Sequence, residues 1–138
     1  MNKKIFIDTN PLIYPVSKKE PFYSKVFHYF SLLIDDNAEF YTSTITDAEF
    51  LVKPLIGNNM IEIQLYKEYL MQLEFIKCCI SEQIAETAAL IRSKYKGIKL
   101  ADALQIASCI NNECDEFLTN DKQLKQVTDV TIVYLGDL

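Results

Sequence analysis

Short apolar runs alternate along this 138-residue chain with longer segments whose apolar residues recur at helical spacing. This alternation is typical of α/β proteins, in which helices cover both faces of a mainly parallel sheet. The sequence therefore predicts a three-layer α/β/α sandwich on a roughly five-stranded sheet, formed as a single domain over residues 1–138. The predicted strands are Lys4–Ile7, Glu39–Ser43, Phe75–Cys79, Glu116–Thr119 and Thr131–Tyr134.

Helical segments are expected between these strands. Pro11 marks a loop or a first helical turn, and a helix follows from Pro21 until Asp35–Asn37. Two helices, one from Thr46 to about Leu51 and one carrying Ile63, Tyr66, Leu70 and Leu73, are expected to form a hairpin that projects from the sheet. A further helix is capped by Ser81, with Ile84, Ala88, Ile91 and Tyr95 on its buried face, and another runs from about Ala101 to Asn111.

Four acidic residues stand where predicted strands end or helices begin: Asp8, Glu49, Asp102 and Asp121. An open parallel sheet gathers the carboxyl ends of its strands along one edge, so these carboxylates can meet in space. Carboxylates clustered without basic partners repel one another, and a hard divalent cation such as Mg²⁺ relieves that repulsion. The pattern predicts a metal-dependent phosphodiesterase site.

Each acid taken alone also has a structural explanation. Thr46 and Glu49 have the spacing of a capping box, and Asp102 at a helix start favours the positive end of the helix dipole. Asp8 and Asp121 can be polar residues that leave buried strands. The four together favour a shared site, because a capping acid needs no strongly apolar helix of the kind that follows Asp102.

Several motifs resemble the PIN domain, the nuclease fold of VapC-type bacterial toxins. They are the apolar strand into Asp8-Thr9-Asn10, the Ser43–Glu49 segment with Thr46-x-x-Glu49, Leu100-Ala101-Asp102-Ala103 after Gly97, and Leu118-Thr119-Asn120-Asp121. The resemblance implies Mg²⁺ or Mn²⁺ held by Asp8, Glu49 and Asp102, with Asp121 as a direct or more distant ligand. Thr9, Asn10 and Thr119 are then supporting polar residues. Asp47 is two residues from Glu49 and cannot face the same way on a helix, so Glu49 is preferred.

The same resemblance implies a metal-dependent endoribonuclease that cleaves RNA with a metal-activated water, as the toxin of a toxin–antitoxin pair. It also implies a small antitoxin partner and a homodimer formed through the 46–73 hairpin, which carries more large apolar residues than one buried face needs. One alternative is a catalytically silent PIN-like module that binds RNA or protein. A phospho-acceptor receiver domain and a dehalogenase-type phosphatase fit poorly, because Asp8 has no acidic neighbour and Asn10 replaces a second aspartate.

The overall charge restricts the substrate contacts. The net charge is −5, but without the four site acids 15 acidic residues face 14 basic ones, so a polyanionic substrate is not excluded. Phosphate contacts are expected to be few, with Lys99 and Lys122 favoured over Lys18, Lys19, Lys53 and Lys125. His28 lies off its helix's apolar stripe and is not expected to be catalytic.

The compartment is predicted from the apolar runs and the cysteines. No run is long enough to cross a membrane and the N-terminal segment does not resemble a signal peptide, so a cytoplasmic protein is expected. Cys78, Cys79, Cys109 and Cys114 match no zinc or redox motif and are expected to be reduced, mostly buried thiols.

Overall fold

The computed structural model describes residues 2–18 and 20–138; Lys19, one of the lysines considered for phosphate contact, lies outside these ranges. Its sheet has five parallel strands in the order β3-β2-β1-β4-β5. These are β1 (Lys4–Ile7), β2 (Glu39–Ser43), β3 (Ile76–Cys78), β4 (Glu116–Thr119) and β5 (Thr131–Tyr134). The predicted parallel α/β architecture is confirmed, and four strands have the predicted bounds. In the described residues no helix has the length and apolar character needed to span a membrane.

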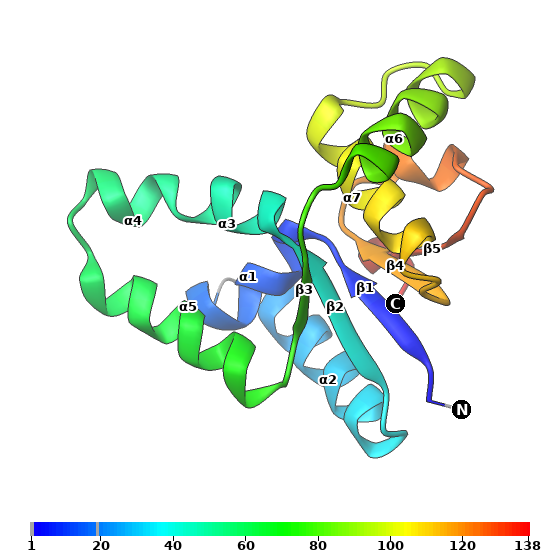
Figure 1. Cartoon of the computed structure of the whole chain (residues 1–138). Helices are drawn as coiled ribbons and strands as arrows, with labels where there is room; N and C mark the ends of the chain where they lie inside the picture. Colours follow the sequence, from blue (N-terminus) through cyan, green and yellow to red (C-terminus); the bar gives the residue numbers. More distant parts are fainter. Residues whose placement is uncertain (1, 19) are drawn as a thin grey trace.

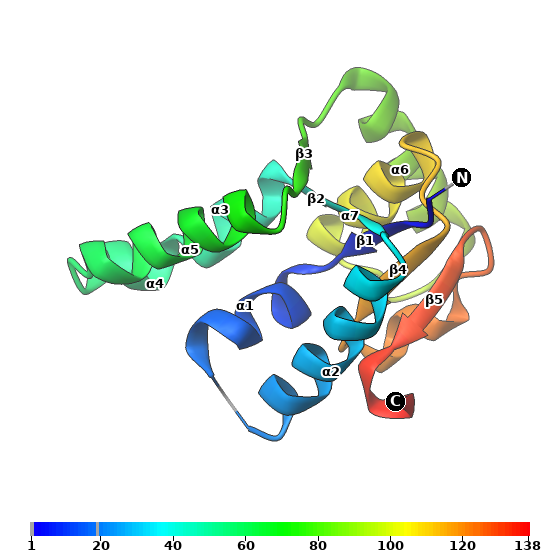
Figure 2. The same cartoon turned by 90° about the horizontal axis from the view of Figure 1, so that it is seen from below.

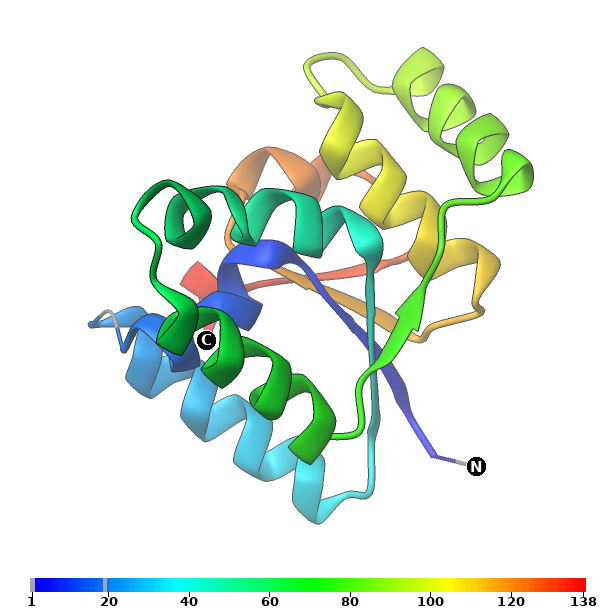
Figure 3. The same ribbon diagram turned by 60° about the vertical axis from the view of Figure 1, so that its left-hand side comes forward.

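Two helical layers enclose the sheet, as Figures 1 and 3 show. Helices α6 (Glu82–Lys94) and α7 (Leu100–Asn111) cover one face, and α1 (Thr9–Ser17) and α2 (Phe22–Asp35) cover the other. Side chains alternate along β1 to serve both cores: Phe6 packs under α7 and stacks on Phe117 at 5.5 Å, while Ile5 and Ile7 face α1 and α2. Two short 3₁₀ helices, η1 (Lys122–Gln126) and η2 (Leu135–Asp137), flank β5.

The helical hairpin predicted between Thr46 and Leu73 is present as three helices that project from the sheet, which we call the arm (Figures 1 and 2). They are α3 (Thr44–Phe50), α4 (Val52–Ile56) and α5 (Met60–Gln72). Phe50 and Tyr66 anchor the arm to the body, with ring centroids 4.2 Å apart, and both are buried. The arm therefore shares the core of the α1 and α2 layer at its base and exposes its outer surface.

Several predicted boundaries were wrong. Helix α3 begins at Thr44 because Ser43, not Thr46, is its N-cap and accepts a hydrogen bond from the Ile45 N–H. Pro54 lies inside α4, a short helix that the sequence did not predict. Strand β3 is shorter than predicted because it is the exposed edge of the sheet, where Ile76 and Lys77 face solvent. Helix α6 ends at Lys94, so Tyr95 lies beyond it.

Helix α1 is longer than predicted, since Pro11 indicates only a loop or a first helical turn. It continues through Pro15 to Ser17, and Tyr14 stacks on Phe22 of α2 at 4.8 Å. Packing against α2 therefore holds a helix whose two prolines lower its intrinsic propensity.

Candidate active site

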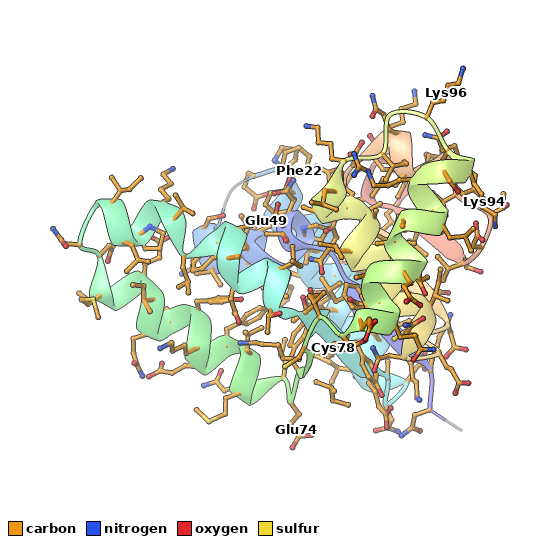
Figure 4. All side chains as sticks on the ribbon, turned by 45° about the horizontal axis from the view of Figure 1, so that its top comes forward. Phe22, Glu49, Glu74, Cys78, Lys94 and Lys96 are labelled. Carbon is orange, nitrogen blue, oxygen red and sulfur yellow. The ribbon has the colours of Figure 1, made fainter. Side chains whose placement is uncertain are left out.

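The four predicted acids occupy the edge of the sheet where the parallel strands end. Asp8 directly follows β1 and caps α1 by accepting a hydrogen bond from the Thr9 N–H at 2.9 Å. Asp121 follows β4, the neighbour of β1, and caps η1. Glu49 projects from α3, just after β2, and Asp102 lies in the first turn of α7. Figure 4 shows Glu49 at the base of the arm, where it joins the body.

Asp8 is the most deeply buried of these acids, at 7% exposure. Burial, with smaller contributions from the nearby charges of Asp102 and Glu49, raises the pKa of Asp8 to about 7. Hydrogen bonds from the Thr119 hydroxyl (2.9 Å) and the Thr9 N–H oppose this shift. Near neutral pH, Asp8 is therefore close to its titration midpoint, which is unusual for an aspartate.

Asp102 experiences the same kind of environment. Partial burial raises the pKa of this carboxyl above its ordinary value, and the charges of Asp121 and Glu49 add to the effect, while Lys99 opposes it. Each of the four acids is thus close enough to influence at least one other. Among the described residues, none of them forms an ion pair with a lysine or an arginine.

Three supporting polar residues were predicted, and the structure places two of them against the acids. Thr9 donates a hydrogen bond to Glu49 Oε1 at 2.6 Å, and Thr119 donates to Asp8 Oδ2. The Thr119 hydroxyl also accepts from the Asp121 N–H at 3.1 Å, which ties Asp121 to Asp8 through one side chain. Asn10, in contrast, is exposed on α1 and lines a groove.

The capping-box explanation of Glu49 is wrong. Thr46 is fully buried inside α3, and its hydroxyl lies 2.9 Å from that of Thr42 and 3.2 Å from that of Thr9. Glu49 therefore bonds across to α1 and does not close a capping box at the start of its own helix. Its orientation results from tertiary contacts.

Asp47, the acid that the sequence ranked below Glu49 as a site residue, makes its contacts outside the acidic cluster. Its carboxylate forms a salt bridge with Lys77 of β3 at 2.9 Å and accepts a hydrogen bond from the Tyr66 hydroxyl at 2.8 Å. Asp47 thus fastens the arm to the edge strand.

Sequence reasoning missed a buried polar group beneath the acids. Gln105 of α7 is fully buried and bonds to Thr9, Thr46 and Ser43. One signal was available: a glutamine interrupts the apolar face of this helix three residues after Asp102, which places both side chains on the same side.

A groove of about 460 Å³ extends from Thr9 and Glu49 along α1 and the arm. Thr9 and Glu49 lie in both the groove and the acidic cluster, and Lys53 supplies a positive charge farther along. Of the other lysines considered, Lys125 is paired with Asp137 at 2.7 Å, whereas Lys99 and Lys122 are exposed beside Asp102 and Asp121 in sequence. The remaining lining residues are Asn10, Ile13, Tyr14, Ser17, Phe50, Pro54 and Glu62.

His28 and the cysteines lie outside this cluster. His28 is exposed on α2. The cysteines are free thiols, as predicted: Cys78, Cys109 and Cys114 are buried, and Cys79 is exposed.

The donor atoms of the cluster suit a hard divalent cation, because they are carboxylate oxygens with no basic partner in the described residues. No group of three or more acidic, thiol or imidazole side chains in residues 2–18 and 20–138 lies in an arrangement that could hold a metal ion as it stands. Both oxygens of Asp8, one of Glu49 and one of Asp121 accept hydrogen bonds from neighbouring donors. Ion binding would therefore exchange some of these bonds for coordination.

Comparison with known proteins identifies the family. The model of the PIN domain matches residues 5–130, which is most of the chain. No curated protein sequence matches it. Among solved structures, VapBC2 from Rickettsia felis bound to a DNA fragment from their promoter is similar at a TM-score of 0.78 and 16% identity, over 95% of this chain and 98% of that one. FitAcB from Neisseria gonorrhoeae is similar at 0.75 and 24%, over 97% and 99%, and a toxin–antitoxin complex from Klebsiella pneumoniae at 0.69 and 23%, over 95% and 97%. These structures share the fold, and the family match together with the five-stranded parallel sheet shows that this chain belongs to the PIN domain family.

Proposed function

We propose that this protein is a divalent-metal-dependent endoribonuclease that acts as the toxin of a toxin–antitoxin pair. The observation that carries the proposal is the meeting of Asp8, Glu49, Asp102 and Asp121 at one edge of the sheet without basic partners in the described residues. Membership of the PIN family supports the nuclease activity. The similar Klebsiella structure is itself a toxin–antitoxin complex, which supports the biological context.

Asp8, Glu49 and Asp102 would hold Mg²⁺ or Mn²⁺, with Asp121 as a direct or water-mediated ligand. When bound, such an ion activates water for in-line attack and stabilises negative charge at the scissile phosphate. Thr9 and Thr119 orient Glu49 and Asp8 through the hydrogen bonds described above. One of the site carboxylates would take up the proton that the attacking water releases.

The groove beside the cluster supports a single-stranded RNA substrate. Its wall combines apolar side chains, against which a base can pack, with the ammonium group of Lys53, which can contact a backbone phosphate. Lys99 and Lys122, which are exposed and close in sequence to Asp102 and Asp121, would make further phosphate contacts. A few local contacts of this kind agree with the acidic overall charge.

The exposed surface of the arm supports the proposal that this protein binds partner proteins. Its outer surface carries large apolar side chains that are each more than half exposed: Val52, Leu55, Ile56, Met60, Ile61, Leu65 and Met71. A contiguous segment with this many exposed apolar residues is characteristic of an interface. We propose that this surface forms a homodimer and also binds a small antitoxin.

Cleavage of a labelled RNA that contains single-stranded and looped regions tests the proposal. Wild-type protein should cleave it with Mg²⁺ or Mn²⁺, EDTA should abolish cleavage, and Asp102→Asn should reduce the rate by at least about 100-fold. Asp47→Asn is the matched control, because it removes an acid from the arm that bonds to Lys77 and Tyr66, and it should keep the activity. Undiminished cleavage in EDTA would refute the metal mechanism. RNA binding without cleavage under any metal condition would favour the silent binding module.

A further inference from the structure

Gln105 lies one helical turn after Asp102 and is completely buried. A buried amide is unfavourable unless its donors and acceptor are satisfied. Its Oε1 accepts a hydrogen bond from the Ser43 hydroxyl, and its Nε2 donates to Thr46 at 2.8 Å and to Thr9 at 3.3 Å. One side chain of α7 therefore joins the end of β2, the arm and the start of α1.

The direction of each hydrogen bond follows from the number of protons available. Ser43 already accepts from the Ile45 N–H, and it donates its hydroxyl proton to Gln105. The Gln105 amide then uses its two N–H groups on the hydroxyls of Thr9 and Thr46. Because the Thr9 oxygen accepts from this amide, its single proton is available for Glu49 Oε1, 2.6 Å away.

The opposite amide orientation disrupts this pattern. Oε1 would then face Thr9 and Thr46, and the Thr9 proton would be drawn toward Gln105 and away from Glu49. The second branch of the network agrees with the observed direction, because Thr46 can donate to Thr42 at 2.9 Å and Thr42 donates to the Ile7 carbonyl at 3.1 Å. Every hydroxyl in the network then has one donor role, and the Gln105 amide is fully used.

We infer that Gln105 is a positioning residue: through Thr9 it holds the Glu49 carboxylate toward the acidic cluster. Glu49 is otherwise exposed on the surface of the arm. A free glutamate side chain populates many rotamers, and fixing it costs conformational entropy. The buried network fixes the Thr9 hydroxyl, and the bond from Thr9 to Glu49 then holds Glu49 in one conformer before a ligand binds. The role in metal binding rests on the proposed function, but the effect on the Glu49 conformer does not.

Three-bond NMR couplings of Glu49 in the full-length, metal-free protein test the inference directly. Wild type should show one dominant side-chain conformer. Gln105→Met, which keeps the length but removes the amide, and Thr9→Val, which removes the hydroxyl, should both show rotamer averaging. Thr9→Ser should restore the single conformer because it restores the donor. If Gln105→Met fails to fold, Gln105→Leu, which also removes the amide at this position, replaces it in the comparison.

The matched control is Thr42→Val. It removes a buried hydroxyl from the same network, but from the branch that ends on Ile7 and does not reach Glu49. It should lower Tm while leaving the Glu49 couplings at their wild-type values. Averaging in Thr42→Val equal to that in Thr9→Val, or a single conformer in Gln105→Met whether or not Thr9→Val averages, would overturn the inference.

Mn²⁺ titration calorimetry adds a second readout. Gln105→Met and Thr9→Val should weaken Mn²⁺ binding roughly 10-fold, as is usual when a group that orients a ligand is lost, and Thr42→Val should not. If the couplings change as expected but wild type binds no Mn²⁺, the positioning role stands and the proposed metal site fails. If wild type binds Mn²⁺ and neither the couplings nor the affinity change in the variants, the positioning role fails and the metal site stands.

Discussion

Replacing Asp8 with asparagine should stabilise the metal-free protein at neutral pH and above. The pKa of Asp8 is raised from 3.8 to about 7, chiefly by burial. A folded state with a raised acid pKa binds its proton more tightly than the unfolded chain. The stability from this group is therefore fully present below about pH 4 and is lost as the pH rises through about 7.

The size of the effect follows from the shift. At about 1.4 kcal/mol per unit, ionising buried Asp8 removes about 4 kcal/mol from the free energy of unfolding between the low-pH and high-pH limits. Between about pH 5 and about pH 8 the loss is roughly 2–3 kcal/mol. Asparagine does not titrate and keeps both contacts, since its oxygen can accept from the Thr9 N–H and its amide can donate to the Thr119 hydroxyl. A packing cost of the replacement would change the unfolding free energy of the variant equally at every pH, so it would not alter the pH dependence that is measured.

Urea unfolding in EDTA, followed by circular dichroism across this pH range, measures the effect. The difference in unfolding free energy, variant minus wild type, should grow by roughly 2–3 kcal/mol and level off above about pH 7. In Thr119→Val, which keeps Asp8, the loss of stability with rising pH should occur at higher pH than in wild type, because the variant lacks the hydrogen bond that lowers the pKa of Asp8. Millimolar Mg²⁺ should reduce the difference by stabilising wild type through mass action. A difference that stays flat with pH would show that Asp8 is already ionised in the folded state and that the electrostatic argument is incorrect.

Two further predictions concern the arm. Tyr66→Phe should lower the free energy of unfolding by about 1–3 kcal/mol, because it removes a hydroxyl that donates to the Asp47 carboxylate. Tyr69→Phe should be neutral or stabilising, because the Tyr69 hydroxyl is buried with no partner among the described residues. Equal losses of the two variants in urea unfolding would contradict this prediction. The double variant Leu55→Lys, Ile61→Lys should convert a dimer to a monomer in size-exclusion chromatography with light scattering, whereas Leu90→Lys on α6, an equally exposed leucine, should not. A monomeric wild type at tens of micromolar would argue against the dimer.

The sheet was largely determined by local sequence. Strands β1, β2, β4 and β5 were predicted at their observed bounds, because each is a short apolar run enclosed by polar or turn residues. The placement of Asp8 and Asp121 at one edge also followed from the sequence, since parallel strands end on the same side. Helix α7 was predicted to within one residue by its apolar periodicity.

Helix boundaries around the arm depended on tertiary contacts. Thr46 and Ser43 are both acceptable N-caps by residue type, and the sequence favoured Thr46 because Glu49 completes the spacing of a capping box. In the folded chain the Thr46 hydroxyl bonds to Thr42 and Gln105, which leaves Ser43 as the cap. Burial of a hydroxyl within a network overrides a local preference of about 1 kcal/mol.

The electrostatics of the acidic cluster also required the tertiary structure. The sequence predicted that the carboxylates would meet and repel one another, but it could not identify Asp8 as the acid whose pKa is raised most. Burial is the largest cause of that shift, and burial depends on β1 lying in the middle of the sheet beneath α1 and α7. Residue types and their order along the chain therefore predicted the acidic cluster. Long-range packing decided which acid is desolvated and which buried amide orients its neighbour, because both depend on contacts between segments far apart in the sequence.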